Sequence, residues 1–423
     1  MLDPAFIRKN TDAVRKGLAD KGETGDLDWY LQLDKDRRTV QTENQQIAAR
    51  QNVVSKALGA KKGKGEDFAA ELAEADELKT KLKLLDERET LLTEDQRRIL
   101  MRMPNLCAPD VPVGTSAADN VVEATWGEAP VFDFAPKPHW DIGAALGMFH
   151  PVEAGKLSGS GFSLMTGQLA QLERALWNYM LDLHTREHGY VEAAVPYMVK
   201  AHCLEGTSQL PKFETEMYRL RDDDLYLIPT AEVSLTNIHR QEILAPEKLP
   251  IRYAAFSPCF RREAGAAGRD TRGLIRMHQF HKVELMSFTL PEESDAEHLR
   301  IRTNAETILR NLKLHYRVLL LCTGDTSFGS RKTWDLELWA PGVGGWLEVS
   351  SVSTFGDFQA RRAGVRVKRA GKTEFVHTLN GSGVALPRLL IALIETYQKA
   401  DGSITVPEVL RPYMGWKSEI RAG

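Results

Sequence analysis

Apolar residues recur at every seventh position in two stretches of the first hundred residues. The first stretch contains Leu33, Val40, Ile47 and Val54, and the second contains Leu78, Leu85, Leu92 and Ile99. Seven-residue spacing places side chains along one narrow stripe of a helix, which indicates two long helices that share a seam. The segment 59–65 between them is too rich in glycine to continue a helix. We therefore predict an antiparallel helical hairpin over residues 28–58 and 68–100, about 45 Å long, that extends into solvent or onto a partner.

The remainder of the chain predicts a second domain of a different kind. A length of 423 residues exceeds the usual size of a single hydrophobic core. Prolines and glycines are frequent in residues 104–150, which indicates a connector. Short strands then alternate with helices to about residue 400, a pattern that favours an antiparallel sheet with helices packed against it. The predicted fold class is α+β, with an N-terminal antiparallel helical coiled-coil arm.

Composition and charge limit the function classes. The formal net charge is −3, so no overall positive field attracts nucleic acid, and an RNA site has to be a local patch. No apolar run approaches the roughly 20 residues that span a bilayer, and the first residues lack a signal-peptide core, so we expect a cytoplasmic protein. The four cysteines have no metal-ligand spacing, which predicts reduced thiols and no structural zinc.

Positive charge is concentrated in the first half of the predicted arm. Between residues 35 and 65 there are eight basic residues against two acidic ones, Asp36 and Glu43. The basic residues are Lys35, Arg37, Arg38, Arg50, Lys56, Lys61, Lys62 and Lys64. On these residues alone, a solvated face of a coiled coil and an RNA-binding surface are equally good interpretations.

A second basic segment, residues 260–284, combines arginines with two acids and an aromatic ring. Its arginines are Arg261, Arg262, Arg269, Arg272 and Arg276. Guanidinium groups offer paired donors to phosphate oxygens, Phe280 offers a face to a base, and Glu263 and Glu284 accept hydrogen bonds. Apolar residues before the segment and alternation after it predict two strands joined by a basic loop. A hairpin folded over a nucleoside triphosphate is one interpretation, and a solvated hairpin tip is the other.

Four stretches together resemble the bacterial-type seryl-tRNA synthetases, a family of class II aminoacyl-tRNA synthetases. Residues 230–232 (TAE) are similar to the serine-binding loop of that family, and the basic hairpin is similar to motif 2 of the class. Residues 348–351 (EVSS), followed by residues 355–362 (FGDFQARR), resemble the ATP and metal segment, and residues 380–383 (NGSG) with Arg388 resemble motif 3. The helix expected from residue 168 and the strand that ends at Pro196 resemble motif 1, which implies a homodimer. All four stretches stand in family order behind a helical arm, which argues against coincidence.

The resemblance implies an ATP site in which each residue has a role. Arg261 would contact the α-phosphate, Glu263 the adenine amino group and Arg276 the outer phosphates. Phe280 would stack on the adenine opposite Arg388, which would also reach the γ-phosphate. The implied catalytic residues are Arg261 and Arg388. The full implied ATP set is Arg261, Arg262, Glu263, Arg276, Met277, Phe280, Glu348, Val349, Ser350, Ser351 and Arg388.

The resemblance also implies the metal, the amino acid and the reaction. Glu348 and Ser351 would coordinate the Mg²⁺ that accompanies ATP. The implied serine site consists of Thr230, Ala231, Glu232, Glu284, Asn380 and Ser382. Thr230 and Glu232 would lie near the substrate ammonium, and Glu284, Asn380 and Ser382 would surround its side chain. A buried acceptor such as Glu284 loses its partner when alanine replaces serine, which discriminates strongly between the two. The implied reaction activates L-serine with ATP and transfers it to the 3′ end of tRNA(Ser), and also to tRNA(Sec) where the host has one.

In this family the arm grips the long variable arm of the tRNA, so the resemblance favours RNA contact over a merely solvated face. It implies a tRNA-binding domain over residues 1–105 and a catalytic domain over residues 106–423. The implied tRNA contacts on the arm are Lys35, Arg38, Arg50, Lys56, Lys61, Lys62 and Lys64.

Three competing interpretations remain in view. A threonyl or prolyl synthetase would share the nucleotide hairpin, but not the bare coiled coil together with the TAE loop. A degenerate paralogue that uses its arm as a scaffold would not be expected to keep Arg261, Glu263, Glu348 and Arg388. A relative that aminoacylates a carrier protein would not need the arm. Gly161, Ser208 and the pair Leu386-Pro387 depart from common family residues, and Ser208 is expected to resist a positive φ that glycine would allow.

Overall fold

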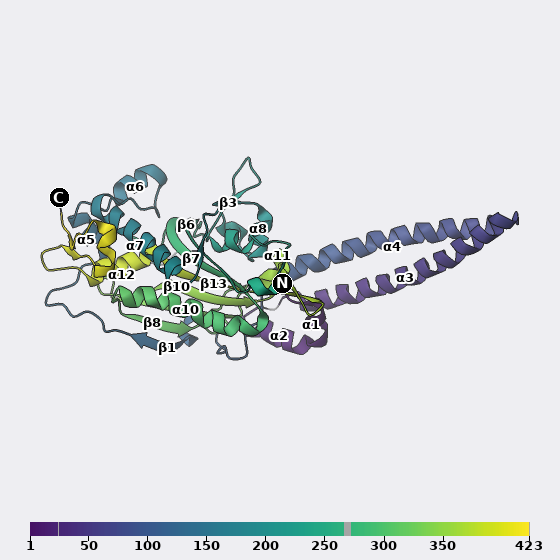
Figure 1. The fold of residues 1–423 in the computed structure, drawn as a ribbon, viewed down its shortest axis with the longest axis horizontal. Coiled ribbons are helices and arrows are strands. Elements are labelled where there is room, and N and C mark those ends of the chain that lie inside the picture. Colours follow the sequence, from purple (N-terminus) through teal and green to yellow (C-terminus); the bar gives the residue numbers. More distant parts are fainter. Residues whose placement is uncertain (24, 266–271, 423) are drawn as a thin grey trace. The chain divides into compact units, whose positions relative to one another are not determined.

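The computed structural model describes residues 1–23, 25–265 and 272–422, and these form two compact units. The helical unit consists of Leu2–Ala19 and Glu23–Pro104, and the sheet unit consists of Asn105–Gly423 with Met1 and Asp20–Gly22. Four helices make up the described part of the N-terminal region (Figure 1): α1 (Pro4–Lys9), α2 (Thr11–Asp20), α3 (Leu27–Lys64) and α4 (Ala69–Arg102).

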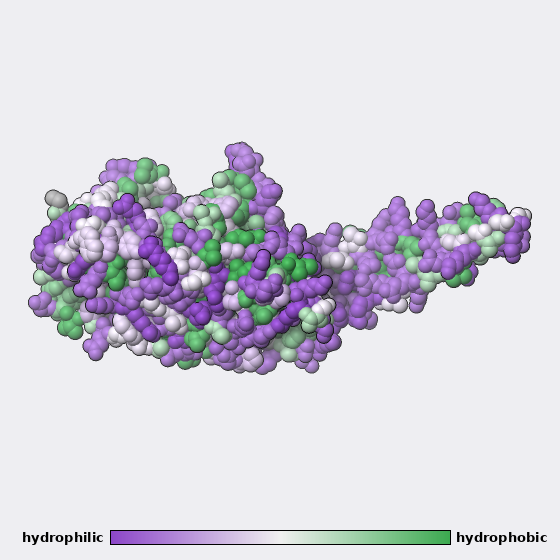
Figure 2. All heavy atoms as spheres, in the orientation of Figure 1, coloured by the Kyte–Doolittle hydropathy of each residue, from purple (hydrophilic) through white to green (hydrophobic). Residues whose placement is uncertain are grey.

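Helices α3 and α4 form the predicted antiparallel hairpin, and the heptad residues lie in its seam. Six of the eight are buried, while Ile47 and Leu92 are half-buried. The face of the hairpin that Figure 2 shows is largely hydrophilic. Near the start of α3, at the end of the hairpin away from its turn, Asp34 is buried. It accepts hydrogen bonds from Arg8, Arg38 and Gln96 at 3.0, 3.1 and 3.3 Å. Three donors around one buried carboxylate satisfy its hydrogen-bonding capacity and link α1, α3 and α4.

The first long helix continues beyond the predicted boundary at residue 58 and ends at Lys64. The prediction that glycines would stop it was wrong. Gly59 and Gly63 are helical, since each costs only about 1 kcal/mol in an otherwise favourable helix. The helix ends at Gly65, whose φ of 70° is the left-handed geometry of a C-terminal cap. The backbone N–H groups of Gly65 and Glu66 donate to the carbonyls of Lys62 and Lys61 there.

The sheet unit is built on an eight-stranded sheet in the order β1-β8-β9-β10-β13-β7-β6-β2. Its strands are β1 (Val121–Trp126), β2 (Val191–Glu192), β6 (Ile251–Phe260), β7 (Gln279–Thr289), β8 (Tyr316–Leu320), β9 (Lys332–Ala340), β10 (Gly345–Gly356) and β13 (His377–Ala385). Neighbours pair antiparallel, except that β2 runs parallel to β6 at one edge. The α+β architecture is confirmed. The region predicted as a connector supplies β1, the strand at the other edge.

Successive side chains of the central strands point to opposite faces of the sheet, so one face packs on the core and the other is polar. On β7, Val283 and Leu285 are buried in the main core, whereas Phe280 and Lys282 line a pocket. Helices α7 (Gly167–Arg186), α10 (Ser294–Asn311) and α12 (Leu386–Thr396) contribute buried apolar residues to that main core. The helix expected from residue 168 is confirmed as α7, and one face of it is buried through Leu169, Leu172, Leu176, Tyr179 and Leu183.

Two short helices pack over the polar face of the sheet, near the C-terminal end of β7. They are α9 (Glu232–Thr236) and α11 (Phe358–Ala363), which share a second apolar cluster with Met286 and Phe288 of β7. The remaining helices are α5 (His139–Ala145), α6 (Pro151–Ser158) and α8 (Ala201–Gly206). The small sheets comprise β3 (Met198–Val199) with β4 (Tyr226–Leu227), β5 (Ile243–Leu244) with β11 (Arg366–Arg369) and β12 (Lys372–Phe375), and β14 (Ile404–Thr405) with β15 (Glu419–Ile420). None of the helices in the described part of the chain combines the length and apolar character needed to cross a membrane.

Candidate active site

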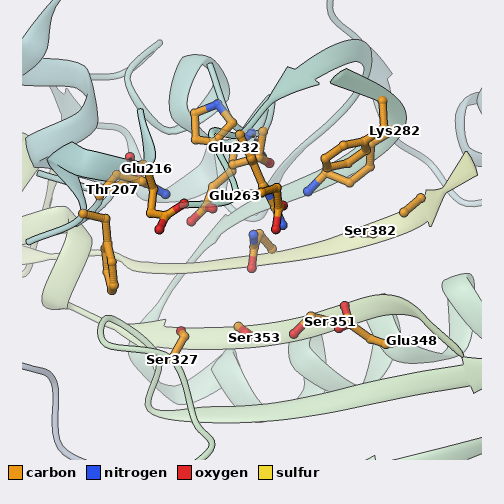
Figure 3. A pocket seen from close by; sticks show the side chains of 18 of the residues that line it. Thr207, Glu216, Glu232, Glu263, Lys282, Ser327, Glu348, Ser351, Ser353 and Ser382 are labelled. Carbon is orange, nitrogen blue, oxygen red and sulfur yellow. Dashed lines mark hydrogen bonds between the residues drawn. The ribbon is translucent and has the colours of Figure 1, made fainter. Parts of the chain in front are cut away.

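A pocket of about 530 Å³ lies over the polar face of strands β7, β10 and β13. Alternate residues of these strands form its floor, because side chains two positions apart share a face. In Figure 3, Lys282, Ser382 and Glu348 lie toward one end of the pocket, and Thr207, Glu216 and Ser327 lie toward the other. The loop after β6, the segment before β7 and the start of α9 provide the walls.

The pocket brings together most of the residues that the sequence singled out. The predicted residues in its lining are Thr230, Glu232, Arg261, Glu263, Arg276, Met277, Phe280, Glu348, Ser351, Asn380, Ser382 and Arg388. Five others do not line it: Ala231, Arg262, Glu284, Val349 and Ser350. Of these, Arg262 has an exposed side chain, while Glu284 is fully buried directly behind the lining. Arg269 falls outside the described residues.

Two arginines approach Phe280 and strand β10 from different elements. The Arg261 guanidinium lies 5.1 Å from the centre of the Phe280 ring, which is within cation–π distance. Arg388 stands in the first turn of α12, where it donates to the backbone carbonyls of Ile275 at 3.2 Å and Glu348 at 3.0 Å. These two contacts hold the Arg388 side chain between the end of the basic loop and strand β10. Two planar guanidinium groups therefore lie in the pocket near Phe280 and strand β10. Such groups can donate paired hydrogen bonds to phosphate oxygens.

Glu263 and Arg276 form an ion pair with each other inside the pocket. Both side chains are largely buried, and Glu263 has a φ of 51°, a left-handed geometry that is uncommon outside glycine. The two charges thus neutralise one another. A ligand that uses both side chains has to separate them.

A buried cluster of charged and polar groups surrounds Glu284 on β7. Glu284 pairs with Lys282 at 2.5 Å, and the Asn380 amide of β13 donates to its Oε1 at 2.9 Å. Ser382 lies opposite Glu284 in the register of β7 and β13. The Glu284 charge is therefore neutralised locally by an ammonium group. An acceptor of this kind suits a neutral hydroxyl.

Glu232 is the first residue of α9 and its side chain is also buried. Its backbone N–H donates to the Thr230 hydroxyl at 3.2 Å, and Gln359 of α11 donates to its Oε1 at 2.6 Å. Burial, followed by the nearby Glu284 charge, raises the pKa of Glu232 to about 7. The Gln359 hydrogen bond and the charges of Lys282 and Arg261 act in the opposite direction.

Oxygen donors for a divalent cation gather on β9 and β10. Glu348 and Ser351 line the pocket, and Asp335 lies opposite Ser351 in the strand register. Burial, followed by the Glu348 charge, raises the pKa of Asp335 well above its ordinary range. Asp335 Oδ1 is buried and has no hydrogen-bond partner among the described residues. Carboxylates that repel each other around an unsatisfied oxygen fit a hard cation such as Mg²⁺.

Sequence reasoning gave no role to Lys282, Gln359, His139 and Glu395. Lys282 was visible within the alternating pattern of β7, but its pairing with Glu284 was not. Buried Glu395 accepts hydrogen bonds from the backbone N–H and Nδ1 of His139 at 2.9 and 3.0 Å. His139 Nε2 in turn accepts from the backbone N–H of Leu274 at 3.0 Å. These hydrogen bonds fix the segment that leads from the basic loop into β7, which lines the pocket at Leu274. No local sequence pattern predicts them.

The three departures from common family residues fit their surroundings. The expectation that Ser208 would resist a positive φ was wrong, because it adopts a φ of 69°. Gly161 has a φ of 79°, and a Cβ there would lie 2.6 Å from the His278 ring, so a larger residue would require local rearrangement. Leu386 and Pro387 begin α12, where proline in the first turn lacks only an N–H that the helix does not use.

Three of the candidate RNA-binding residues of the arm are paired within the helical unit. Arg38 pairs with Asp34, Arg50 with Glu74 at 2.7 Å, and Lys61 with Glu71 at 2.5 Å. Within the part of the chain that the structure describes, Lys35, Lys56, Lys62 and Lys64 form no ion pair. The positive charge available to a partner is therefore greatest near the end of α3.

Comparisons with known proteins agree with this geometry. The family described as seryl-tRNA synthetase N-terminal domain matches residues 1–107, and the tRNA synthetase class II core domain (G, H, P, S and T) matches residues 212–397. The serine–tRNA ligase of Syntrophotalea carbinolica is 51% identical over 100% of both chains, and that of Pelotomaculum thermopropionicum is 50% identical over 99% of this chain and 100% of its own. The crystal structure of seryl-tRNA synthetase from Pyrococcus horikoshii complexed with ATP is similar over 100% of both chains, with a TM-score of 0.95 and 37% identity.

Proposed function

The chain belongs to the seryl-tRNA synthetase family and acts as a serine–tRNA ligase, and we propose that the pocket over β7, β10 and β13 carries out both steps of that reaction. The first step forms seryl-adenylate and pyrophosphate from L-serine and ATP. The second transfers the seryl group to the 3′ end of tRNA. The observation that carries this assignment is one pocket with planar cations at one end and two buried carboxylates beside it.

In the first step the serine carboxylate oxygen bonds to the α-phosphorus of ATP while the bond from that phosphorus to pyrophosphate breaks. Two anions must meet, so positioning and charge neutralisation provide most of the acceleration. We assign Arg261 to the α-phosphate and Arg388 to the γ-phosphate. Phe280 and Arg388 stack on opposite faces of the adenine, and both line the pocket.

ATP binding, in this assignment, separates the ion pair of Glu263 and Arg276. Glu263 accepts from the adenine amino group and Arg276 moves to the outer phosphates. Each side chain thereby exchanges one polar partner for another, so neither is left buried and unpaired. Glu348 and Ser351, with Asp335 opposite Ser351 in the strand register, would hold the Mg²⁺ that accompanies ATP. Held there, the ion would supply positive charge to the phosphate oxygens.

Serine selection uses the two buried carboxylates for different atoms. Glu232 with Thr230 binds the substrate ammonium, and Glu284 with Asn380 and Ser382 receives the substrate hydroxyl. Alanine would leave the Glu284 acceptor without its donor, which is a larger penalty than a missing methylene group would cause. Threonine would place a methyl group in a space lined by these polar side chains.

The second step requires no protein nucleophile, because the terminal ribose hydroxyl of the tRNA attacks an acyl group that is already activated. We assign tRNA binding to residues 1–105 and catalysis to residues 106–423. The partner is tRNA(Ser), with tRNA(Sec) as a further substrate where the host has one. We place both steps in the cytoplasm, as the family membership suggests.

We further propose a homodimer formed through α7 and the edge of the sheet near Pro196. Strand β2 is an edge strand that contains the exposed Val191, and the exposed apolar residues Tyr197 and Met198 follow it in the chain. An edge strand with exposed apolar neighbours is suited to pairing with a second copy. The mass of the protein in solution by light scattering tests this, and a monomer at micromolar concentration would contradict it.

Serine alone is expected to support strong ATP–pyrophosphate exchange when each of the twenty amino acids is supplied in turn. The physical reason is the pair of differently partnered carboxylates, which together require an ammonium and a hydroxyl on a small substrate. Equal exchange with threonine or proline would instead assign the chain to another class II specificity. No exchange with any amino acid would favour the scaffold interpretation.

A further inference from the structure

Three buried side chains from different elements form a chain of hydrogen bonds that ends in the pocket. The Thr378 hydroxyl of β13 donates to Gln359 Oε1 at 2.8 Å, and Gln359 Nε2 donates to Glu232 Oε1 at 2.6 Å. Thr378 and Gln359 are fully buried, and Glu232 is 6% exposed. Among the residues that the structure describes, none donates a hydrogen bond to the other oxygen, Glu232 Oε2.

We propose that Gln359 is a positioning residue for serine activation: Thr378 fixes the orientation of its amide, and the amide holds Oε1 of Glu232 so that Oε2 is presented to the substrate ammonium. This inference rests on the proposed role of Glu232 in binding serine. Gln359 itself touches neither serine nor ATP, since it is not in the pocket lining.

The direction of the hydrogen bonds determines which end of the amide faces Glu232. A hydroxyl that donates to the amide oxygen leaves the amide N–H groups to point toward the carboxylate. The reversed amide would place its oxygen against a carboxylate oxygen, and two acceptors in a buried site repel. Thr378 therefore acts on Glu232 only through Gln359.

The partner of each buried carboxylate matches a different part of serine. Glu284 is paired with the ammonium of Lys282, so its charge is already neutralised and it is suited to a neutral hydroxyl. Glu232 receives an uncharged amide donor, so the ionised carboxylate keeps its negative charge for a cation. An amide that orients a carboxylate without neutralising it is what recognition of an ammonium group requires.

The charged groups around Glu232 determine the direction of the pH dependence. Glu284 on β7 faces it with a like charge, whereas Lys282 on β7, Arg261 after β6 and Gln359 on α11 favour its ionised form. With a pKa of about 7, Glu232 is protonated in much of the free enzyme below neutral pH. Serine binds the ionised form, so the KM for serine falls as the pH rises through 7. Loss of the Gln359 donor raises the pKa of Glu232 and moves this fall to higher pH.

The experiment measures ATP–pyrophosphate exchange from about pH 6 to about pH 9 for Gln359→Met and Thr378→Val, with Thr378→Ser as the matched control. Gln359→Met keeps the chain length and removes the donor. We expect its serine KM to rise about fivefold at pH 7 and close to tenfold at pH 6, because a hydrogen bond to a charged group contributes on the order of one pKa unit. The serine KM should recover toward the wild-type value at high pH, while the ATP KM stays unchanged. Thr378→Val should give a smaller shift of the same sign, and Thr378→Ser, which keeps the hydroxyl, none.

A loss of serine affinity that is the same at every pH would overturn the proposal, as would a parallel rise in the ATP KM. The variant Glu232→Gln tests the role of Glu232 in binding serine separately from the positioning role of Gln359. A normal serine KM in Glu232→Gln would contradict the proposed role of Glu232 itself. A raised, pH-independent KM in Glu232→Gln together with an unmoved profile in Gln359→Met would overturn only the positioning role. If Gln359→Met does not fold, the comparison of Thr378→Val with Thr378→Ser decides the matter.

Discussion

Arg261→Ala is expected to lower kcat for ATP–pyrophosphate exchange by about a hundredfold or more, which is the usual effect of removing one donor aimed at transition-state charge. Arg261 lies over the Phe280 ring, and both residues line the pocket. The charge on the α-phosphorus oxygens grows as the serine carboxylate attacks, so the guanidinium stabilises the transition state more than bound ATP. Steady-state exchange at varied ATP and serine measures this.

Two further variants define what the Arg261 result means. Arg261→Lys keeps the charge but loses the planar paired donors, so its kcat should remain well below the wild-type value. Arg317→Ala removes an arginine that pairs with Glu337 on β9 and does not line the pocket, and its exchange should be normal. A rise in the ATP KM at constant kcat in Arg261→Ala would show a role in ground-state binding instead.

Shortening the arm is expected to separate the two steps of the reaction. Asn44 donates to Asp86 across the hairpin at 2.6 Å, so removal of residues 45–85 leaves two facing helix ends that a short glycine linker can join. The retained stem keeps Asp34 with its three donors. Serine activation should persist, because no residue of the arm lines the pocket. Transfer to tRNA should fall on the order of a hundredfold, since most of the concentrated positive charge is removed.

A charge-reversal variant tests the same surface with the hairpin intact. Lys56, Lys62 and Lys64 form no ion pair with any described residue, so replacing all three with glutamate should weaken tRNA binding without opening the hairpin. The dependence of log affinity on log salt should flatten in both variants, by close to one unit for each RNA phosphate that the arm no longer neutralises. Aminoacylation measured beside exchange decides the outcome. If both activities survive the shortening, the arm is not the tRNA-binding element and the scaffold interpretation of residues 1–100 regains weight.

Local patterns in the sequence were sufficient for the arm and for the sheet hairpin. Heptad spacing predicted the seam of α3 and α4, because helix periodicity depends on the chain itself and not on distant contacts. The end of α3 was missed because the favourable residues around Gly59 and Gly63, together with the cap at Gly65, outweighed the glycine penalty. The residues proposed to bind ATP could likewise be predicted, since they lie within short segments of the sequence.

Contacts between distant segments were decided only by the tertiary structure. Gln359 and Glu232 are 127 positions apart, and Asn380 and Glu284 are 96 apart. The family resemblance implied that Glu232 lies near the substrate ammonium and Glu284 near the substrate side chain, but it did not show which group partners either carboxylate. Folding gave one an amide partner and the other an ammonium partner, and thereby made them suited to a cation and a hydroxyl. The physical reason is that the charge state of a buried carboxylate depends on the groups packed around it. Here those groups are set by the register of β7 and β13 and by the packing of α9 and α11.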